Sequence, residues 1–174
     1  HNIDLNSASF QVLAFMIPFV ASAGSLISGY ISDTMFKGRR APVAAGLFFL
    51  ESVVIFCAAI MIPAATRFGL DSGTTAIVFL LLISLTANST HSILGTAAAM
   101  DIGGRKMAGF ASGLINSFQY FGGSLAGYFL GKLLDKNWDY YFYFMIPFGI
   151  IGGLLMLTIQ GRVTLKAKQK TPPS

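Results

Sequence analysis

Two polar residues inside one apolar stretch could bind a small ligand. Asn88 and His91 are three residues apart and share a face if the stretch is helical, and Ser84 and Gly95 extend that face. The amide and the imidazole can both donate hydrogen bonds, and a protonated His91 would add positive charge or titrate during a binding cycle. The alternative for His91 is a neutral side chain that holds helices together through a neighbouring carbonyl group.

A second polar stripe lies in the next apolar stretch. Asn116 and Tyr120 are one helical turn apart, Gln119 lies beside them, and three glycines continue the stripe at the same spacing. These glycines are Gly123, Gly127 and Gly131. The amides could line a binding cavity or join two helices, where such a bond contributes about 0.6 kcal/mol. The glycine ladder favours helix packing, on a smooth face that would also let two helices slide.

A carboxylate and several basic residues lie between the first two apolar stretches. Asp33 follows Gly29 by one helical turn and precedes Lys37, Arg39 and Arg40. Gly29 would let a neighbouring helix approach closely. Asp33 could pair with a loop arginine in a contact that breaks when the helices rearrange. The alternative is an ordinary basic loop in which Asp33 is solvated.

The composition excludes a soluble enzyme. Of the 174 residues, 54% are hydrophobic and only 11% are charged, and the mean hydropathy is +0.67. A soluble domain carries roughly 25% charged residues. The single Cys57 excludes a disulfide framework and a cysteine metal cluster. Glycine-rich phosphate loops, His–Glu metal spacings and nucleophile–base pairs are also missing, so we expect no catalytic residue, no metal and no cofactor.

The elements that must position the polar residues are therefore membrane helices. A bilayer core of about 30 Å needs on the order of 20 apolar residues per helix, and five stretches qualify. They cover about residues 8–32, 41–66, 74–100, 107–134 and 140–160. The sequence predicts an all-α integral membrane protein with five transmembrane helices, a bundle over residues 1–160 and a basic tail over 161–174.

The basic residues orient this bundle. Nine of the twelve lie in the first loop, the third loop and the tail, against three on the other side. The nine are Lys37, Arg39, Arg40, Arg105, Lys106, Arg162, Lys166, Lys168 and Lys170. Because cytoplasmic loops carry the excess of Lys and Arg, we expect a cytoplasmic C-terminus and a periplasmic or extracellular N-terminal flank. Basic residues confined to loops and a tail do not indicate nucleic-acid binding.

Three segments together resemble a known family. Ser32 to Pro42 reads S-D-x-x-F-x-G-R-R-A-P, and Ala99 to Gly113 has an acidic residue, small residues, a basic pair and then A-G-x-A-x-G. Ser117 to Ser124 has an aromatic and glycine pattern. In this order they resemble the organophosphate:phosphate antiporters of the major facilitator superfamily. The departures are the five-residue spacing from Asp33 to Gly38, and Gly104 where many members carry proline.

The resemblance implies that the five spans are helices eight to twelve of a twelve-helix fold. It implies exchange of a phosphorylated metabolite for inorganic phosphate by alternating access, in the bacterial inner membrane. Tyr120 matches a cavity tyrosine of the family, and His91, Asn88, Asn116 and Gln119 would shape the same cavity. The family's phosphate-binding arginines lie on helices one and seven. The chain also begins without Met, so we expect a C-terminal part whose partners are the N-terminal half of the same polypeptide and membrane lipid.

The resemblance also implies a latch on the cytoplasmic side. It would join the first loop to the third when the carrier faces outward. Its residues would be Gly29, Asp33, Lys37, Arg39, Arg40, Asp101 and Arg105.

Other interpretations remain open at this stage. They are a membrane sensor that binds a sugar phosphate without transporting it, a major facilitator carrier for an unphosphorylated substrate, and an independent five-helix scaffold. Glu51 lies in the middle of the second stretch, where an unpaired carboxylate would cost about 2.5–3.5 kcal/mol. We expect it to be protonated or turned toward a neighbouring helix, with proton coupling as a further role.

Overall fold

The chain forms an all-helical bundle. The computed structural model describes residues 8–137 and 140–170, and the side chains at 8–9, 101–102, 105 and 161–170 lie outside the described part. The elements in chain order are α1 (Ala8–Thr34), α2 (Arg40–Ala64), the 3-10 helix η1 (Ala65–Phe68), α3 (Ser72–Ser92), the π-helix η2 (Ile93–Ala98), α4 (Ala99–Leu134) and α5 (Tyr140–Lys170).

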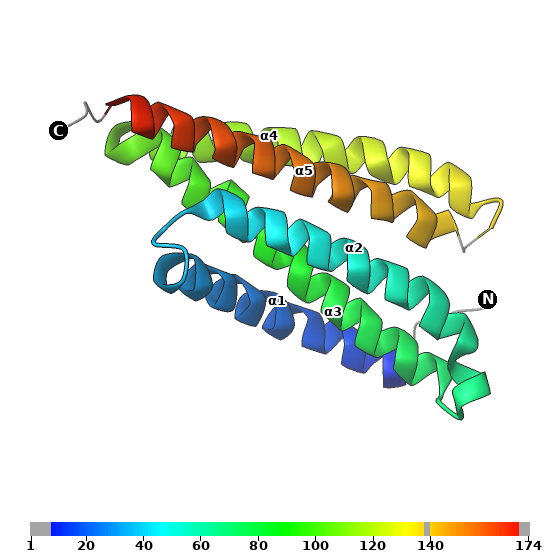
Figure 1. Ribbon diagram of the computed structural model, residues 1–174. Coiled ribbons are helices and arrows are strands. Elements are labelled where there is room, and N and C mark those ends of the chain that lie inside the picture. The colour runs from blue at the N-terminus through cyan, green and yellow to red at the C-terminus, as the bar shows by residue number, and fades with distance from the viewer. Residues whose placement is uncertain (1–7, 138–139, 171–174) are drawn as a thin grey trace.

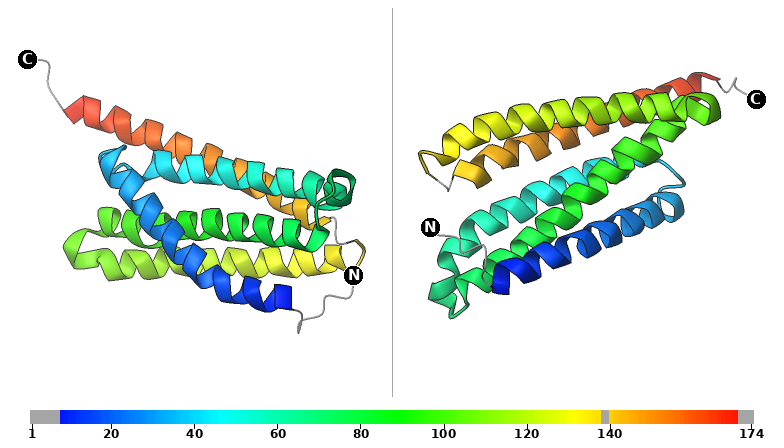
Figure 2. Two further views of the ribbon diagram at one scale, coloured as in Figure 1. Left: turned by 90° about the horizontal axis from the view of Figure 1, so that it is seen from below. Right: turned by 180° about the vertical axis from the view of Figure 1, so that it is seen from behind.

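Helix α2 lies at the centre of the packing. It pairs with α5 along most of its length and also packs against α3, which in turn packs against α1 (Figures 1 and 2). The core clusters follow this arrangement: Ile55 and Ala58 of α2 pack against Ile83 of α3, and Val43 and Ala44 pack against Ile93 of η2. The α1, α2, α3 and α5 helices therefore form the tightly packed part of the bundle.

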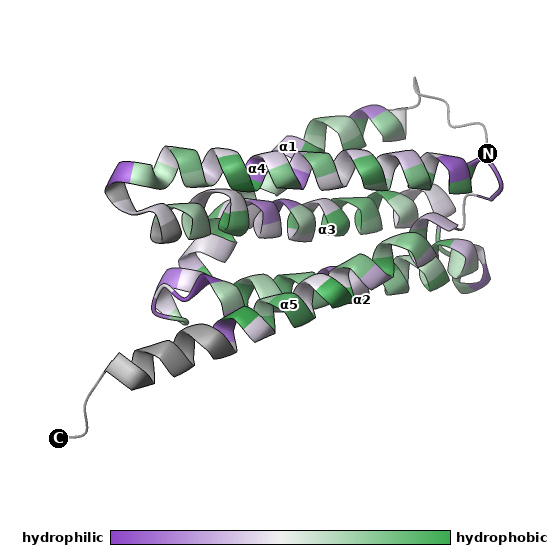
Figure 3. Ribbon diagram, turned by 90° about the horizontal axis from the view of Figure 1, so that it is seen from above, coloured by the Kyte–Doolittle hydropathy of each residue, from purple (hydrophilic) through white to green (hydrophobic). Residues whose placement is uncertain are grey.

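Helix α4 is attached differently. Among the described residues its backbone comes close only to η2 and to α5. Large apolar side chains along it are more than half exposed, including Phe110, Phe118 and Phe121. Figure 3 shows pale and purple positions interspersed with green ones along this helix. One face of α4 is thus left open in the described structure.

Four helical segments are long and apolar enough to cross a membrane. They are Phe10–Thr34, Arg40–Phe68, Ser72–Ala98 and Tyr140–Gln160, which coincide with four of the five predicted stretches. The remaining stretch, 107–134, forms most of α4, but its polar stripe makes it less apolar than the others. The described residues therefore form an integral membrane protein with four clear spans, and the predicted count of five is not established.

The predicted third loop is a sharp reversal inside one continuous helical segment. Gly104 has φ 58° and ψ −171°, which breaks α4 shortly after its start and turns the chain back. A Cβ on Gly103 would lie 3.0 Å from the backbone nitrogen of Ala108, so the chain passes very close to itself. A proline, whose φ is fixed near −65°, could not adopt the backbone of Gly104. The glycine that departs from the family pattern is thus required by this turn.

The start of α3 is fixed by a side-chain cap. Asp71 accepts hydrogen bonds from the backbone nitrogen of Thr74 at 2.7 Å and from its hydroxyl at 2.9 Å. These bonds lower the pKa of Asp71, because they stabilise the charged carboxylate. The cap satisfies a backbone donor that the first helical turn leaves free.

Candidate functional site

A π-helical turn brings α3 and α4 together. Helix α3 passes directly into η2, where the backbone widens and a buried glycine, Gly95, faces α4. The hydroxyl of Ser112 on α4 donates a hydrogen bond to the carbonyl oxygen of Gly95 at 2.7 Å. Single π-helical turns inside α-helices occur frequently at functional sites.

Two amide oxygens converge on the same glycine. A Cβ on Gly95 would lie 2.6 Å from Oδ1 of Asn116 and 3.2 Å from Oε1 of Gln119. Both oxygens are buried, and neither accepts a hydrogen bond within the described part of the chain. The Asn116 amide nitrogen lies 3.5 Å from the hydroxyl of Ser112. We call the group Gly95, Ser112, Asn116 and Gln119 the polar seam.

The polar seam holds two acceptors that need donors. A buried oxygen without a hydrogen bond costs about 1–3 kcal/mol, so a donor from a ligand, a water molecule or another segment would be stabilising there. The absence of a side chain at Gly95 makes the space for both amides. The sequence pattern predicted Gly95 only as an extension of the stripe that contains Asn88, and it did not indicate Ser112 as a candidate residue.

His91 and Tyr120 meet on the open side of α3 and α4. Their ring centroids are 6.2 Å apart with an interplanar angle of 61°, and Tyr120 is 69% exposed. Asn88 instead donates to its own helix, with its amide nitrogen 2.8 Å from the carbonyl oxygen of Ser84 and 3.2 Å from its hydroxyl. The structure thus places an imidazole beside a phenol on an accessible face, with the half-buried Asn88 one turn earlier on the same helix.

The basic loop between α1 and α2 contains one ion pair. Nη1 of Arg40 lies 2.7 Å from Oδ1 of Asp33, with Arg40 19% and Asp33 62% exposed. Lys37 and Arg39 are exposed and form no ion pair with a described carboxylate. Apart from the backbone of its own helix, no described atom lies within 4 Å of a Cβ built on Gly29. The structure therefore contains an ion pair between Asp33 and a loop arginine. No described neighbouring helix approaches Gly29.

The other half of the predicted latch cannot be placed. The side chains of Asp101 and Arg105 lie outside the described residues. The close contact that α1 does make is at Gly24, where a Cβ would lie 2.6 Å from the hydroxyl of Ser89 and 2.8 Å from the carbonyl oxygen of Leu85. Sequence reasoning missed Gly24, because many glycines occur in these spans and only the residue opposite distinguishes them.

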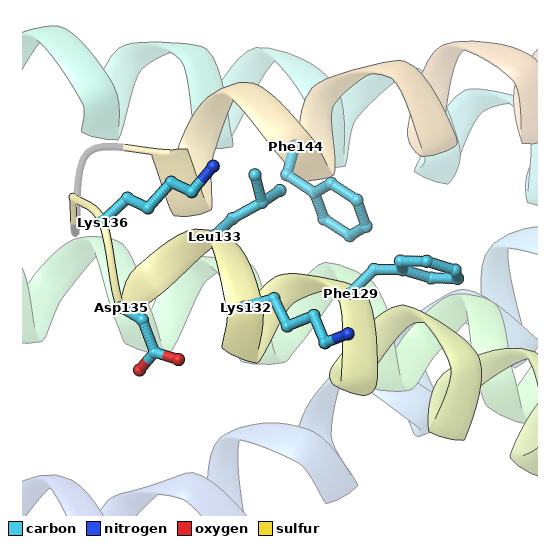
Figure 4. A pocket seen from close by; sticks show the side chains of 6 residues that line it. All are labelled: Phe129, Lys132, Leu133, Asp135, Lys136 and Phe144. Atoms are coloured by element: carbon cyan, nitrogen blue, oxygen red, sulfur yellow. The ribbon is translucent and has the colours of Figure 1, made fainter.

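A cavity of about 540 Å³ lies between the end of α4 and the start of α5. It is lined by Phe129, Lys132, Leu133, Asp135, Lys136 and Phe144 (Figure 4). Nζ of Lys132 lies 4.5 Å from the ring centroid of Tyr128, a cation–π contact. None of the residues predicted to bind substrate lines this cavity. Among the described residues, no group of three or more His, Cys, Asp or Glu could hold a metal ion.

Comparison with known proteins finds similar sequences among transporters and a membrane sensor. The chain is 31% identical over 142 residues to a probable hexose phosphate transport protein of Chlamydia trachomatis, covering 77% of this chain and 28% of the relative. It is 32% identical over 127 residues to the glycerol-3-phosphate transporter of Bacillus subtilis, covering 72% and 27%. It is 27% identical over 156 residues to the membrane sensor protein UhpC of Escherichia coli, covering 89% and 33%.

These matches are partial in length. The chain spans between about a quarter and a third of each of these three relatives. No family profile and no solved structure matches it. The three relatives are named for transport or sensing, which favours a protein that is not an enzyme.

Proposed function

The chain belongs to the organophosphate:phosphate antiporter family of the major facilitator superfamily, and on that premise we propose that it forms the C-terminal helices of a carrier. The carrier exchanges a phosphorylated metabolite, such as glycerol phosphate or a hexose phosphate, for inorganic phosphate by alternating access. The observation that carries this proposal is the similarity to hexose phosphate and glycerol-3-phosphate transporters over about three quarters of the chain.

The polar groups of α3 and α4 suit the uncharged part of such a substrate. The hydroxyl of Tyr120 and the imidazole of His91 can donate hydrogen bonds to phosphate or sugar oxygens. The oxygens of Asn116 and Gln119 are buried against Gly95, so sugar hydroxyls can donate to them in a conformation that opens the polar seam. Substrate hydroxyls would thus supply the donors that the polar seam lacks.

The charge of the phosphate needs a second set of residues. Apart from His91, no described basic side chain belongs to the seam or to the ring pair beside it. The family resemblance places the phosphate-binding arginines on helices one and seven, outside this chain. We therefore assign phosphate binding to the N-terminal half and substrate shape recognition to Tyr120, His91, Asn88, Asn116 and Gln119.

The Asp33–Arg40 pair serves as part of a cytoplasmic latch in this proposal. It joins the end of α1 to the start of α2. Lys37, Arg39 and the third-loop residues Asp101 and Arg105 complete the set expected from the sequence. The ligand can shift such an equilibrium only by its differential affinity for the two states, so the latch must be weak enough for substrate binding to open it.

The test is phosphate exchange by the complete protein in liposomes. Vesicles loaded with inorganic phosphate are given labelled phosphate, with and without glycerol phosphate, hexose phosphates and unphosphorylated sugars as competitors. Inhibition by one organophosphate would support the proposal and identify the substrate. Exchange that no organophosphate inhibits would overturn the substrate assignment.

A second function is a membrane sensor of the same architecture. The observation that favours it is the similarity to UhpC, which extends over 89% of this chain. Detectable binding of a sugar phosphate by the complete protein, without any flux of phosphate or sugar phosphate, would favour the sensor over the carrier.

A further inference from the structure

A second, smaller cavity lies where three helices reach the same end of the bundle. Its volume is about 320 Å³, and it is lined by Met35, Phe36, Lys37, Arg39, Pro42 and Gln160. Figure 1 shows the α1–α2 connection and the later part of α5 at this end. We call it the Lys37 cavity.

The backbone around the Lys37 cavity is well defined by hydrogen bonds. The nitrogen of Gly38 donates to the carbonyl oxygen of Ser32 at 2.9 Å, and that of Arg39 donates to Phe36 at 3.0 Å. Lys37 and Gly38 both have positive φ, 52° and 77°. This turn fixes the points from which the side chains of Lys37 and Arg39 extend.

One of the three basic residues in this loop is paired with a described carboxylate. Arg40 is paired with Asp33, whereas no described carboxylate pairs with Lys37 or Arg39. Two cations therefore border a cavity whose other walls include the apolar side chains of Met35, Phe36 and Pro42. Such a combination suits an anion that carries an apolar part.

The depth of the Lys37 cavity in the membrane follows from the spans. One span ends at Thr34, the next begins at Arg40, and the third reaches Gln160, after which the sequence turns basic at Arg162, so the cavity lies at the same membrane boundary for all three. Helix boundaries of this kind mark the level of the lipid headgroups. Basic pockets between membrane helices at this level can bind anionic headgroups, and arginine matches phosphate oxygens with two parallel hydrogen bonds.

We propose that the Lys37 cavity binds the headgroup of an anionic phospholipid. Lys37 and Arg39 hold the headgroup phosphate, and Met35, Phe36 and Pro42 contact the glycerol backbone and the first carbons of the acyl chains. The proposal depends on the chain being a membrane protein and not on its transport activity. It adds a lipid contact to the place that the proposed latch gives Lys37 and Arg39.

The experiment counts bound lipids on the complete protein by native mass spectrometry. Purified protein is mixed with phosphatidylglycerol or with phosphatidylcholine of the same acyl chains. The test variant is Lys37→Gln with Arg39→Gln, and the matched control is Lys132→Gln with Lys136→Gln, which removes two positive charges from the 540 Å³ cavity between α4 and α5. A charge-preserving variant, Lys37→Arg with Arg39→Lys, guards against loss of folding.

The proposal predicts that the unmodified protein retains phosphatidylglycerol in preference to phosphatidylcholine. The test variant should lose this preference with an affinity decrease on the order of tenfold, while the control and the charge-preserving variant keep it. Equal retention of the two lipids by the unmodified protein would overturn the proposal. So would an equal loss in the control variant, or displacement of the lipid by inorganic phosphate at the same concentration, which would indicate a site for free phosphate.

Discussion

On α5, Gly149, Gly152 and Gly153 lie so close to α2 that a Cβ on any of them would collide with Ser52, Phe48 or Phe49. On α4 after the turn at Gly104, six glycines meet no described atom within 4 Å of the same position, apart from the backbone of their own helix. These are Gly109, Gly113, Gly122, Gly123, Gly127 and Gly131. Glycine is therefore abundant in both helices, but only on α5 does it bring two backbones together.

This difference distinguishes the closely packed pair of α2 and α5 from α4, one face of which is left open. Large aromatic side chains of α2 fill the space over the α5 glycines, so that pair is held by close van der Waals packing, the main source of helix association in membranes. Helix α4 presents most of its glycines and several aromatic rings to open space instead, while the amide oxygens of Asn116 and Gln119 are buried against Gly95. We interpret α4 as the helix kept free for a substrate and for further helices.

The largest expected effect is on the packed pair. In Gly149→Ala the new Cβ would collide with the hydroxyl of Ser52 and lie 2.9 Å from the carbonyl oxygen of Phe48, which is backbone and cannot move aside cheaply. We expect a loss of stability on the order of 1–3 kcal/mol. It can be measured as the lowered unfolding temperature of the complete protein in detergent.

The control for this change is Gly127→Ala on α4, where no described atom is near. The unfolding temperature should stay almost unchanged. If Gly127→Ala destabilised the protein as much as Gly149→Ala, the face of α4 would be closely packed in the complete protein and the comparison would fail.

The next effect concerns the point where the two parts meet. In Gly95→Ala the Cβ would lie 2.6 Å from Oδ1 of Asn116 and displace both amides of the polar seam. We expect substrate affinity to fall on the order of tenfold, since two positioned hydrogen-bonding groups are moved. Competition of the organophosphate against labelled phosphate uptake measures this affinity.

The matched control is Gly113→Ala, one position after Ser112, where a Cβ meets nothing within 4 Å. Uptake and competition should stay close to those of the unmodified protein. Unchanged affinity in Gly95→Ala would show that the seam does not reach the substrate.

A smaller effect is expected on the packed side of the comparison, at the loop between α1 and α2. Asp33→Asn removes the charge that pairs with Arg40 at 2.7 Å. We expect exchange to slow several-fold while the affinity for substrate stays comparatively intact, because the pair acts on the conformational equilibrium and not on the ligand. Initial rates of phosphate exchange at several substrate concentrations separate the two quantities, and a large loss of affinity at unchanged turnover would refute the latch.

The smallest effect is expected on the open face of α4. Tyr120→Phe removes one hydroxyl from a residue that is 69% exposed, so stability should not change. A single hydrogen bond at so exposed a position contributes about 0.5 kcal/mol, the low end of the usual range, which corresponds to a loss of affinity of roughly twofold. Tyr128→Phe, in which the ring beside Lys132 remains, is the control and should keep the affinity.

The hydrophobic pattern was sufficient to predict four of the spans. Long apolar runs bounded by charged loops leave little choice of structure in a bilayer, and each of the four observed spans falls on a predicted stretch. The stretch over 107–134 is predicted as a fifth span, but Asn116 and Gln119 interrupt it and it is not among the four observed spans. The position of this helix in the fold depends on which segment covers its polar face, and that segment cannot be predicted from the residues of the helix itself.

The contacts between residues of different elements were harder to predict from the sequence than the elements themselves. The sequence spacing does not determine which of Lys37, Arg39 and Arg40 pairs with Asp33, since all three follow it by only four to seven residues. The backbone turn selects the partner. Lys37 has a positive φ and the nitrogen of Gly38 donates to the carbonyl oxygen of Ser32, and in this turn it is Arg40 that pairs with Asp33. In the same way, Gly95 could be placed on a helix face, but its position opposite two amides depends on the π-helical turn.

That turn has a consequence for how the family can vary. A π-helical turn holds one residue more than the α-helical turn it replaces, so η2 has the character of a one-residue insertion. Deleting a residue from Ile93–Ala98 would rotate everything before it by about 100° relative to α4. The spans, loops and charge distribution would survive, yet another residue would face Ser112 in place of Gly95. A lineage could thus acquire a new lining between these helices by the loss or gain of a single codon, without substituting any residue of the lining itself.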